Sequence, residues 1–292
     1  MSTFTWNEIR SNNVRTTLLF IAFFTLIAGL STAIGFILNS LILGWGIGLI
    51  FFCGYGLFAY YRGSNMALSL TGAEPADQSE YRTLHNVVEE IAIAASIPKP
   101  EVYIMQNDTP NAFATGMSPE KSAVAVTTGL LQAMDRDELT GVVAHEVAHI
   151  KHQDTKTMLI AGVLVGSIAI LSDIFFRVSI FGGGRQRNNW VFIIVGLLAM
   201  ILAPIVAELI RLAVSRKREF AADAKAVEYT RNPNGMSGAL RKLKHAQTGM
   251  QNTPRSLNHL FIRSDLDDDS FMNKLFSTHP PLDERIQRIE SL

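Results

Sequence analysis

The sequence is poor in cysteine and in charge. A single cysteine, Cys53, occurs among 292 residues, which excludes a disulfide framework or a thiolate metal site and leaves nitrogen and oxygen as the ligands for any metal. Acidic and basic residues number 26 each, so the formal net charge is zero and there is no electrostatic argument for nucleic-acid binding. Charged residues make up only 18% of the chain, a low share for a soluble enzyme.

Hydrophobic residues are abundant instead. They make up 48% of the chain and give a mean hydropathy of +0.20, which indicates a membrane protein. Residues 17–38 and 41–61 contain no charged residue, and each run is long enough to cross a bilayer as a helix. Only Asn39 and Ser40 separate them, so they predict a transmembrane hairpin. A signal peptide is the alternative for the first run, but the polar lead and the length of the run favour retention.

Two further apolar runs cover residues 158–176 and 190–207. Basic residues flank the four runs on the sides expected for the cytoplasm: Arg10, Arg15, Arg62, Lys151, Lys156, Arg211, Arg216, Lys217 and Arg218. The loop between the third and fourth runs also carries Arg177, Arg185 and Arg187, which argues against its crossing to the other side. Four membrane spans are the preferred interpretation, and a hydrophobic hairpin that does not cross is the alternative.

The most informative motif is His-Glu-Val-Ala-His at residues 145–149, the HExxH pattern of zinc hydrolases. Side chains at positions i and i+4 lie on one face of a helix, so His145 and His149 can bind a single ion. Glu146 would then act as the base that takes a proton from water beside the metal. Asp135, with Glu138 three residues later, predicts the N-terminal cap of this helix.

A catalytic zinc site usually has a third protein ligand, and a glutamate downstream is one known choice. Glu219 and Asp223 are four residues apart, so they share a helix face. We expect Glu219 to bind the metal and Asp223 to accept a ring N–H from a ligating histidine. The alternative for Glu219 is an exposed charge paired with Arg216 or Lys217. One zinc ion per chain is expected, although a site of two nitrogens and one oxygen can bind other divalent ions.

The chain resembles the HtpX family of membrane-bound zinc metalloproteases, which are relatives of the prenyl-protein endoproteases. The resemblance rests on four pieces in order: residues 111–116 (Asn-Ala-Phe-Ala-Thr-Gly), the motif at 145–149, Glu219 to Asp223, and residues 278–280 (Thr-His-Pro). It implies an α+β, mostly α, integral membrane metallopeptidase with an active-site helix, a small edge-exposed β-sheet and about four membrane helices. It also implies an endopeptidase of the bacterial inner membrane, induced by stress, that cuts misfolded membrane proteins on the cytoplasmic side.

The expected organisation has five parts. Residues 1–16 are a cytoplasmic lead, 17–61 a transmembrane hairpin, 62–157 the first half of a cytoplasmic protease domain, 158–207 a hydrophobic hairpin and 208–292 the second half. If His149 and Glu219 bind one ion, the chain between them must cross the membrane an even number of times. The short connection from His149 to the third run places the metal within roughly 10 to 15 Å of the bilayer boundary, which suits membrane-bound substrates.

The first half of the protease domain predicts a helix at 83–97, a strand at 101–105, a loop at 111–116 and an edge strand at 122–128. An extended peptide can add to such an edge by main-chain hydrogen bonds. Asn111, Phe113, Ala114 and Val124 are therefore the expected substrate-binding residues. A purely structural turn at 111–116 is the alternative.

The second half predicts a turn at 231–235, a helix at about 236–247, a polar solvated loop at 249–270 and a short C-terminal helix. Because of the resemblance, His279 is expected near the active site, where it stabilises the transition state or occupies the open metal position. Capping of the helix that follows is an equal alternative. Arg285 is expected to form an ion pair rather than to act in catalysis.

Two other functions remain open beside a protease of membrane proteins. A zinc-binding membrane adaptor or chaperone would keep the fold without turnover, but it would have no use for a base at Glu146. A prenyl-protein endoprotease would normally have more membrane helices than this chain can hold. The expected partners are misfolded membrane proteins and the lipid bilayer, with no nucleic acid and with homo-oligomers left open.

Overall fold

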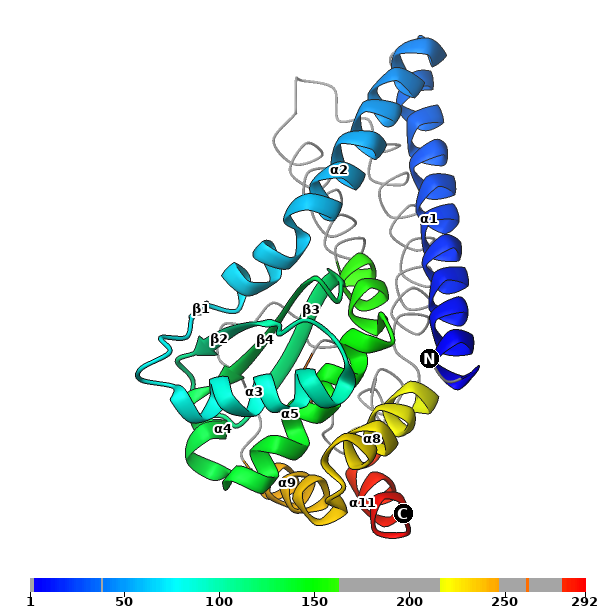
Figure 1. Cartoon of the computed structure of the whole chain (residues 1–292). Coiled ribbons are helices and arrows are strands. Elements are labelled where there is room, and N and C mark those ends of the chain that lie inside the picture. Colours follow the sequence, from blue (N-terminus) through cyan, green and yellow to red (C-terminus); the bar gives the residue numbers. More distant parts are fainter. Residues whose placement is uncertain (1–2, 38, 163–215, 247–260, 263–279) are drawn as a thin grey trace.

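The computed structural model describes residues 3–37, 39–162, 216–246, 261–262 and 280–292. A long helical arm, α1 and α2, rises from a body that contains the sheet and the remaining helices (Figure 1). Of the apolar runs expected to follow the first two, only residues 158–162 are described, and they are helical. The rest of both runs lies outside the described residues, so the number of spans stays a prediction.

The arm is a hairpin of α1 (Thr3–Ile37) and α2 (Leu41–Leu70). Asn39 turns the chain with a φ of 57°, and the Ser40 side chain caps α2 by accepting the N–H of Leu43 at 3.4 Å. Among the described helices, α2 is the one that is long and apolar enough to cross a membrane, and α1 contains a shorter apolar stretch, Thr16–Gly29. Both helices extend past the expected runs, and α2 continues through Arg62 into the body.

The two arm helices approach closely where α2 carries glycine. A Cβ atom on Gly44 would collide with the carbonyl oxygen of Ser31, and one on Gly48 would collide with the Ser31 hydroxyl. Small residues of this kind let two helix backbones pack closely in a lipid environment, where apolar burial gives little driving force. Close packing of the α1 and α2 backbones at these glycines therefore stabilises the hairpin.

The body contains a four-stranded sheet in the order β1-β2-β4-β3, formed by β1 (Ala73–Pro75), β2 (Glu101–Met105), β3 (Ala112–Ser118) and β4 (Lys121–Thr127). The pair β2 and β4 is parallel, and the other two pairs are antiparallel. The expected strand at 101–105 is confirmed. The expected edge strand at 122–128 is wrong in its position, because β4 is an inner strand, and residues 112–116, expected as a loop, form the edge strand β3.

The alternation in β4 has a different cause from the one expected. Val124 and Val126 enter a core on one face of the sheet, while Ala123 and Ala125 enter a second core on the other face. Side chains of a strand alternate between faces, and here both faces are covered. An alternation of large and small apolar residues therefore marks two buried faces, which explains why a half-exposed edge was the wrong expectation.

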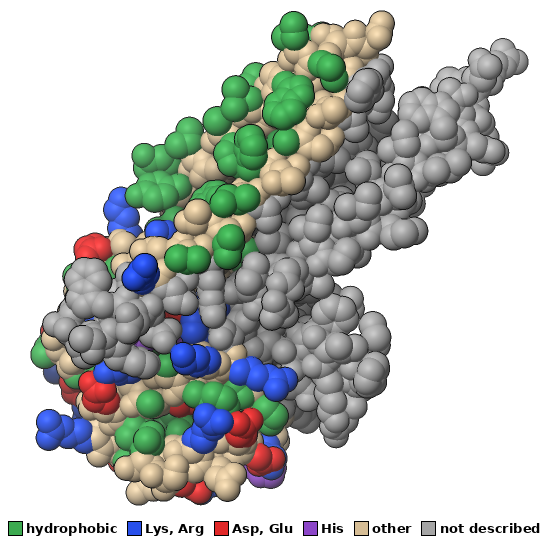
Figure 2. Space-filling view, turned by 90° about the vertical axis from the view of Figure 1, so that its right-hand side faces the viewer, with side chains coloured by type: hydrophobic (Ala, Val, Ile, Leu, Met, Phe, Trp, Pro, Cys, Tyr) green, Lys and Arg blue, Asp and Glu red, His purple; other side chains and the backbone are tan. Residues whose placement is uncertain are grey.

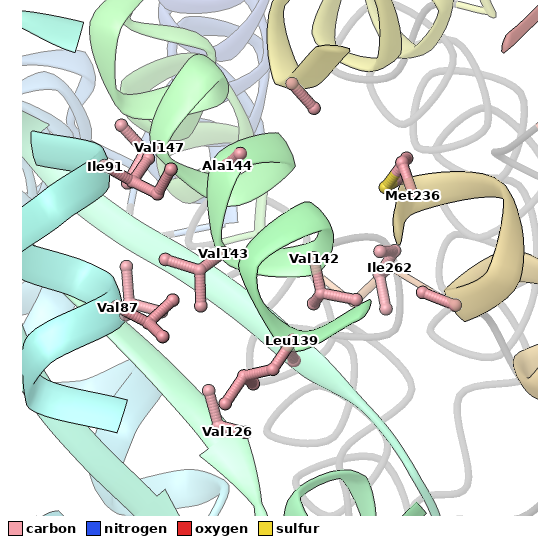
Figure 3. Close-up of a cluster of buried hydrophobic side chains, with 14 of the residues drawn as sticks. Val87, Ile91, Val126, Leu139, Val142, Val143, Ala144, Val147, Met236 and Ile262 are labelled. Carbon is pink, nitrogen blue, oxygen red and sulfur yellow. The ribbon is translucent and has the colours of Figure 1, made fainter. Parts of the chain in front are cut away.

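The larger core joins the sheet to α3 (Arg82–Ala95), α5 (Arg136–Lys151), α9 (Pro233–His245) and α11 (Leu282–Glu290). Helix α5 lies at its centre, with Val143 and Val147 directed towards Val87 and Ile91 of α3, and Val142 towards Met236 and Ile262 (Figure 3). A short helix, α4 (Thr128–Ala133), follows β4. Because the second half of α5 is enclosed by these elements, the polar side chains of His145, Glu146 and His149 are buried as well.

The second core joins the opposite sheet face to the arm. It contains Ala67 and Leu68 from the end of α2, Phe113 from β3, and Met158 and Leu159 from the helical residues 154–162. Two further contacts link the helical residues 154–162 to the arm. The hydroxyl groups of Thr16 and Thr157 lie 3.1 Å apart, and a Cβ atom on Gly63 would lie 3.4 Å from the Leu159 side chain. The arm is therefore anchored directly beside the end of α5.

The cap of α5 is confirmed, and α9 starts earlier than expected. Asp135 and Glu138 form the predicted capping box of α5. Helix α9 begins at Pro233 with Asn232 as its cap, three residues before the expected start, because proline fits the first turn of a helix. The expected loop at 249–270 lies almost wholly outside the described residues.

Candidate metal centre

Three side chains from two helices converge in the body. His145 and His149 come from α5, and Glu219 comes from α8 (Arg216–Thr230), which packs along α5. The two Nε2 atoms are 3.1 Å apart, and each lies 3.5 Å from one oxygen of Glu219. All three side chains are buried, so Glu219 is not the exposed helix charge of the alternative interpretation.

These separations fit a tetrahedral zinc ion. Zinc bonds to nitrogen and carboxylate oxygen are about 2.0 to 2.2 Å long, which sets neighbouring ligand atoms roughly 3.3 Å apart. The three observed separations, 3.1, 3.5 and 3.5 Å, bracket that value. Within the described residues, this is the group of histidine and carboxylate side chains whose ligand atoms come close enough to share one metal ion.

The outer nitrogen of each histidine contacts a carboxylate. The Nδ1 atom of His145 lies 2.9 Å from Asp223, and that of His149 lies 2.9 Å from Asp154. A carboxylate that accepts the Nδ1 proton leaves Nε2 unprotonated and free to bind a metal. Asp223 lies where the sequence placed it. Asp154 was missed, although its position five residues after His149, past a helix end, was a signal that the chain could return to the site.

Two buried arginines neutralise these carboxylates. Arg285 from α11 is completely buried and contacts the two oxygens of Asp223 at 2.7 and 2.9 Å, while Arg218 contacts Asp154 at 3.2 Å. Burial alone would raise the pKa of Asp223, but the charge of Arg285 and the hydrogen bond from His145 outweigh it and hold that pKa below its usual value. Arg285 therefore forms the ion pair that the sequence predicted.

The carboxylates also act on His145. Burial lowers the pKa of this imidazole, but hydrogen bonds to Asp223 and Glu219 outweigh burial and raise it to about 9 in the absence of metal. A cation that enters the site must therefore displace a proton from His145 at neutral pH. The arrangement of charge is that of a site built to hold a positive ion.

Glu146 is buried next to the three converging side chains. Burial raises the pKa of its carboxyl group, and the charges of His145 and His149 oppose that rise. The backbone N–H of Ala114 on β3 also hydrogen-bonds to it. A carboxylate whose pKa is raised is a better proton acceptor, which is the property needed in a general base.

A small pocket surrounds these groups. It is lined by Ala114, His145, Glu146, His149, Thr155, Met158, Glu219, Phe261 and Ile262. Phe261 and Ile262 lie along β3, where Phe261 bridges Phe113 and the N–H of Ile262 donates to the carbonyl of Ala112 at 3.0 Å. The outer edge of β3, next to the pocket, is therefore partly paired by the chain itself.

The expected substrate-binding residues are dispersed. Ala114 lines the pocket, whereas Phe113 packs edge-on against Phe261 in the second core. Asn111 is buried, and its side chain accepts the N–H of Ala112. Val124 lies in the main core and does not line the pocket. His279 lies outside the described residues.

Comparison with known proteins identifies the family. The model of peptidase family M48 matches residues 78–292. The chain is 42% identical to a protease HtpX homolog of Thermoanaerobacter pseudethanolicus, covering 100% of this chain and 99% of that protein. It is 40% identical to a protease HtpX homolog of Streptococcus gordonii, covering 98% and 99% respectively.

A solved structure extends the comparison to the fold. The crystal structure of S. mikatae Ste24p matches with a TM-score of 0.54 at 18% identity, covering 99% of this chain and 67% of that one. At this identity the match shows the fold alone. Together with the HtpX relatives, the long apolar helix α2 indicates membrane association. Metalloproteases of family M48 use zinc, and the donor set of His145, His149 and Glu219 fits that ion. The chain belongs to peptidase family M48 and is a metallopeptidase.

Proposed function

We propose that this protein is a membrane-embedded zinc endopeptidase that hydrolyses misfolded or damaged membrane proteins at the cytoplasmic face, in membrane quality control and the response to stress. The observation that carries the proposal is the convergence of His145, His149 and Glu219 beside a buried carboxylate, Glu146. The HtpX relatives, similar over the whole chain, support a protease. The cellular setting rests on the resemblance and the apolar arm.

The proposed roles follow from the contacts. His145, His149 and Glu219 would hold the zinc ion, which when bound would polarise the scissile carbonyl and lower the pKa of the attacking water. Asp223 keeps the Nε2 atom of His145 available by accepting its Nδ1 proton. Arg285 holds Asp223 ionised and in place through two contacts.

Glu146 performs the proton transfers in this proposal. It accepts a proton from water as the water oxygen bonds to the carbonyl carbon of the substrate, and it then donates that proton to the leaving amine nitrogen as the C–N bond breaks. No side chain forms a bond to the substrate in this scheme. His279 is proposed near the same atoms, where an imidazole N–H would stabilise the developing oxyanion.

Substrate binding is proposed along β3. This strand is an outer strand of the sheet, where residues 261–262 pair with Ala112 and Phe113, and the next residue, Ala114, lines the pocket together with Glu146. An extended peptide placed there would be held by main-chain hydrogen bonds, which suits an enzyme with little sequence preference. Asn111 and Phe113 would support the strand from within, and Val124 has no proposed role in binding because it lies in the core.

The orientation in the membrane is proposed from the chain between the ligands. The helical residues 154–162 follow α5 almost at once and contact the arm through Thr16 and Thr157. The metal centre thus lies at the base of the arm, and a protease placed there would meet its substrates at the membrane surface. Four spans with the body in the cytoplasm satisfy both the basic flanks and the need for an even number of crossings.

The test compares cleavage of an unfolded model protein by the detergent-purified, zinc-loaded chain and by Glu146→Gln. We expect the variant to bind zinc normally. Its cleavage rate should fall by a factor of about 10² to 10⁴, which is the usual contribution of general acid–base catalysis. Glu90→Gln is the matched control, because Glu90 is an exposed glutamate whose side chain is 53% accessible. Its rate should equal that of wild type.

Two other outcomes would change the proposal. Equal cleavage by wild type and Glu146→Gln would remove Glu146 from the mechanism. If neither protein cleaves while both bind zinc, including when a membrane protein is offered as substrate, the adaptor function would replace the protease. Nothing in the described structure favours the adaptor, since Glu146 is in place next to the three donors.

A further inference from the structure

The two histidines are backed by different ion pairs. Asp223 and Arg285 stand behind His145, while Asp154 and Arg218 stand behind His149. The second pair is as buried as the first, with side chains 2% and 3% exposed. Nothing in the proposed mechanism uses it.

The positions of Asp154 and Arg218 in the chain are unusual. Asp154 begins the helical residues 154–162, which lead into the apolar run 158–176. Arg218 lies near the described start of α8, eleven positions after the end of the apolar run 190–207. The pair therefore joins the chain that enters the apolar insertion to the chain that leaves it.

Each residue of this ion pair lies next to one of the proposed metal ligands. On one side, Asp154 accepts a hydrogen bond from Nδ1 of His149 at 2.9 Å. On the other, Arg218 is the residue directly before Glu219 on α8. The ion pair at 3.2 Å thus lies between two of the three proposed ligands and links the helices that carry them.

We infer that Asp154 and Arg218 are positioning residues that hold the side chains of His149 and Glu219 where both can bind the same metal ion. Their ion pair also connects the chain before residue 163 with the chain after residue 215 at the metal centre. Asp154 fixes the tautomer and the ring orientation of His149. Arg218 fixes Asp154 and, through the backbone, the place of Glu219. This inference rests on the proposed function, because it assumes that these donors bind zinc.

A purely structural role, in which the pair only stabilises the packing, explains its burial less well. Two charges removed from water are costly, and apolar side chains of similar volume often stabilise a fold as well or better. A buried pair is more readily explained where one member has a second task, and here Asp154 contacts the imidazole of His149 directly. Loss of such a carboxylate behind a metal-bound histidine typically weakens metal affinity 10- to 100-fold.

The experiment measures zinc affinity of the full chain in detergent by competition with a chromophoric chelator. We expect Asp154→Asn, which keeps the shape and removes the charge, to weaken binding about 10- to 100-fold. Arg218→Met should weaken it in the same direction. Lys217→Met is the matched control, since Lys217 is the exposed neighbour on α8, and its affinity should equal that of wild type.

A single variant leaves one buried charge unpaired and can fail to fold. The double variant Asp154→Asn/Arg218→Gln removes both charges together and keeps hydrogen-bonding groups in place, so we expect it to fold and still to bind zinc at least tenfold more weakly than wild type. Cobalt in place of zinc gives a second reading. The visible absorption bands of the cobalt-loaded protein should shift in the variants, because His149 is no longer held in one orientation.

The failure of this inference can be told apart from that of the proposed function. A wild-type chain that binds no zinc would overturn both. A wild-type chain that binds zinc, with affinity and cobalt spectrum unchanged in folded Asp154→Asn and in the double variant, would overturn the positioning role alone. In that case the pair would only stabilise the packing of α8 against α5.

Discussion

The arm and the body of this protein are built in opposite ways. On the arm, large apolar side chains face outwards, with Ile42 86% and Ile50 76% exposed. In the body, several charged side chains are buried around the metal centre, and Arg285 and Glu219 are completely buried. Figure 2 shows the two surfaces from one side, with hydrophobic side chains gathered along the arm and most of the lysine, arginine, aspartate and glutamate side chains on the body.

The difference teaches that the exposure of a side chain says whether it is stable in its position only when its surroundings, water, lipid or protein, are known. An exposed isoleucine on the arm is stable if the surroundings are lipid, and a buried arginine in the body is stable if a carboxylate neutralises it. The arm is held together by small residues that let the helices approach, whereas the body is held together by burial of apolar surface around α5. Three pairs of substitutions test this contrast.

The largest effect is expected from charge inside the body. Arg285→Met removes the arginine that neutralises the buried Asp223, and we expect a loss of about 3 to 5 kcal/mol in the free energy of unfolding. Lys244→Met breaks an ion pair with Asp283 whose side chains are 42% and 72% exposed, and it should cost less than about 1 kcal/mol. Denaturant unfolding of the metal-free protein in detergent measures both. Equal losses would show that burial of the Arg285 pair has no energetic weight.

The next effect compares two isoleucines of nearly equal exposure. Ile50 on the arm is 76% exposed and Ile93 on α3 is 72% exposed. Ile50→Lys should cost about 3 to 4 kcal/mol in membrane insertion, because lysine at the centre of a membrane helix is unfavourable. Ile93→Lys should change stability by less than about 0.5 kcal/mol. The share of protein in the membrane fraction measures the first, and thermal unfolding the second. Normal membrane insertion of Ile50→Lys would show that the arm lies in water.

The smallest effect concerns glycines on one helix. Gly44→Ala forces α1 and α2 apart at Ser31, and we expect a loss of about 1 to 3 kcal/mol, as for other overpacked sites. Gly46→Ala meets no atom within 4 Å and should be neutral or slightly stabilising. A cysteine crosslink between the two helices, introduced in both backgrounds, would form more slowly only in Gly44→Ala. The same crosslinking rate in both would mean that close packing at Ser31 is unimportant.

Local signals in the sequence predicted the metal-bearing helix well. The capping box of Asp135 and Glu138 and the helix that places His145 and His149 on one face depend on spacing along a helix. The convergence with Glu219 on α8 was expected for a different reason, because a catalytic zinc site usually needs a third protein ligand. The strand at 101–105 also follows from a local run of residues. Such features need no knowledge of the rest of the fold, and the sequence contains them in full.

Features that depend on distant pairing were predicted poorly. The parallel pairing of β2 with β4 places β4 inside the sheet, and the residues of β4 alone do not determine with which strands it pairs. The ion pair of Asp154 with Arg218 was missed for the same reason, since it spans 64 positions in the chain. His279 and most of the third and fourth apolar runs lie outside the described residues, so their roles remain predictions.

The division of the metal centre between α5 and α8 also has a consequence for biosynthesis. Glu219 follows His149 by seventy positions, and both apolar runs between them are made in that interval. At a synthesis rate of about 5 to 20 residues per second, the growing chain spends about 4 to 14 s with two of its three proposed ligands made and the third still missing. Because Glu219 is translated after both apolar runs, the three proposed ligands cannot come together until those runs have been synthesised.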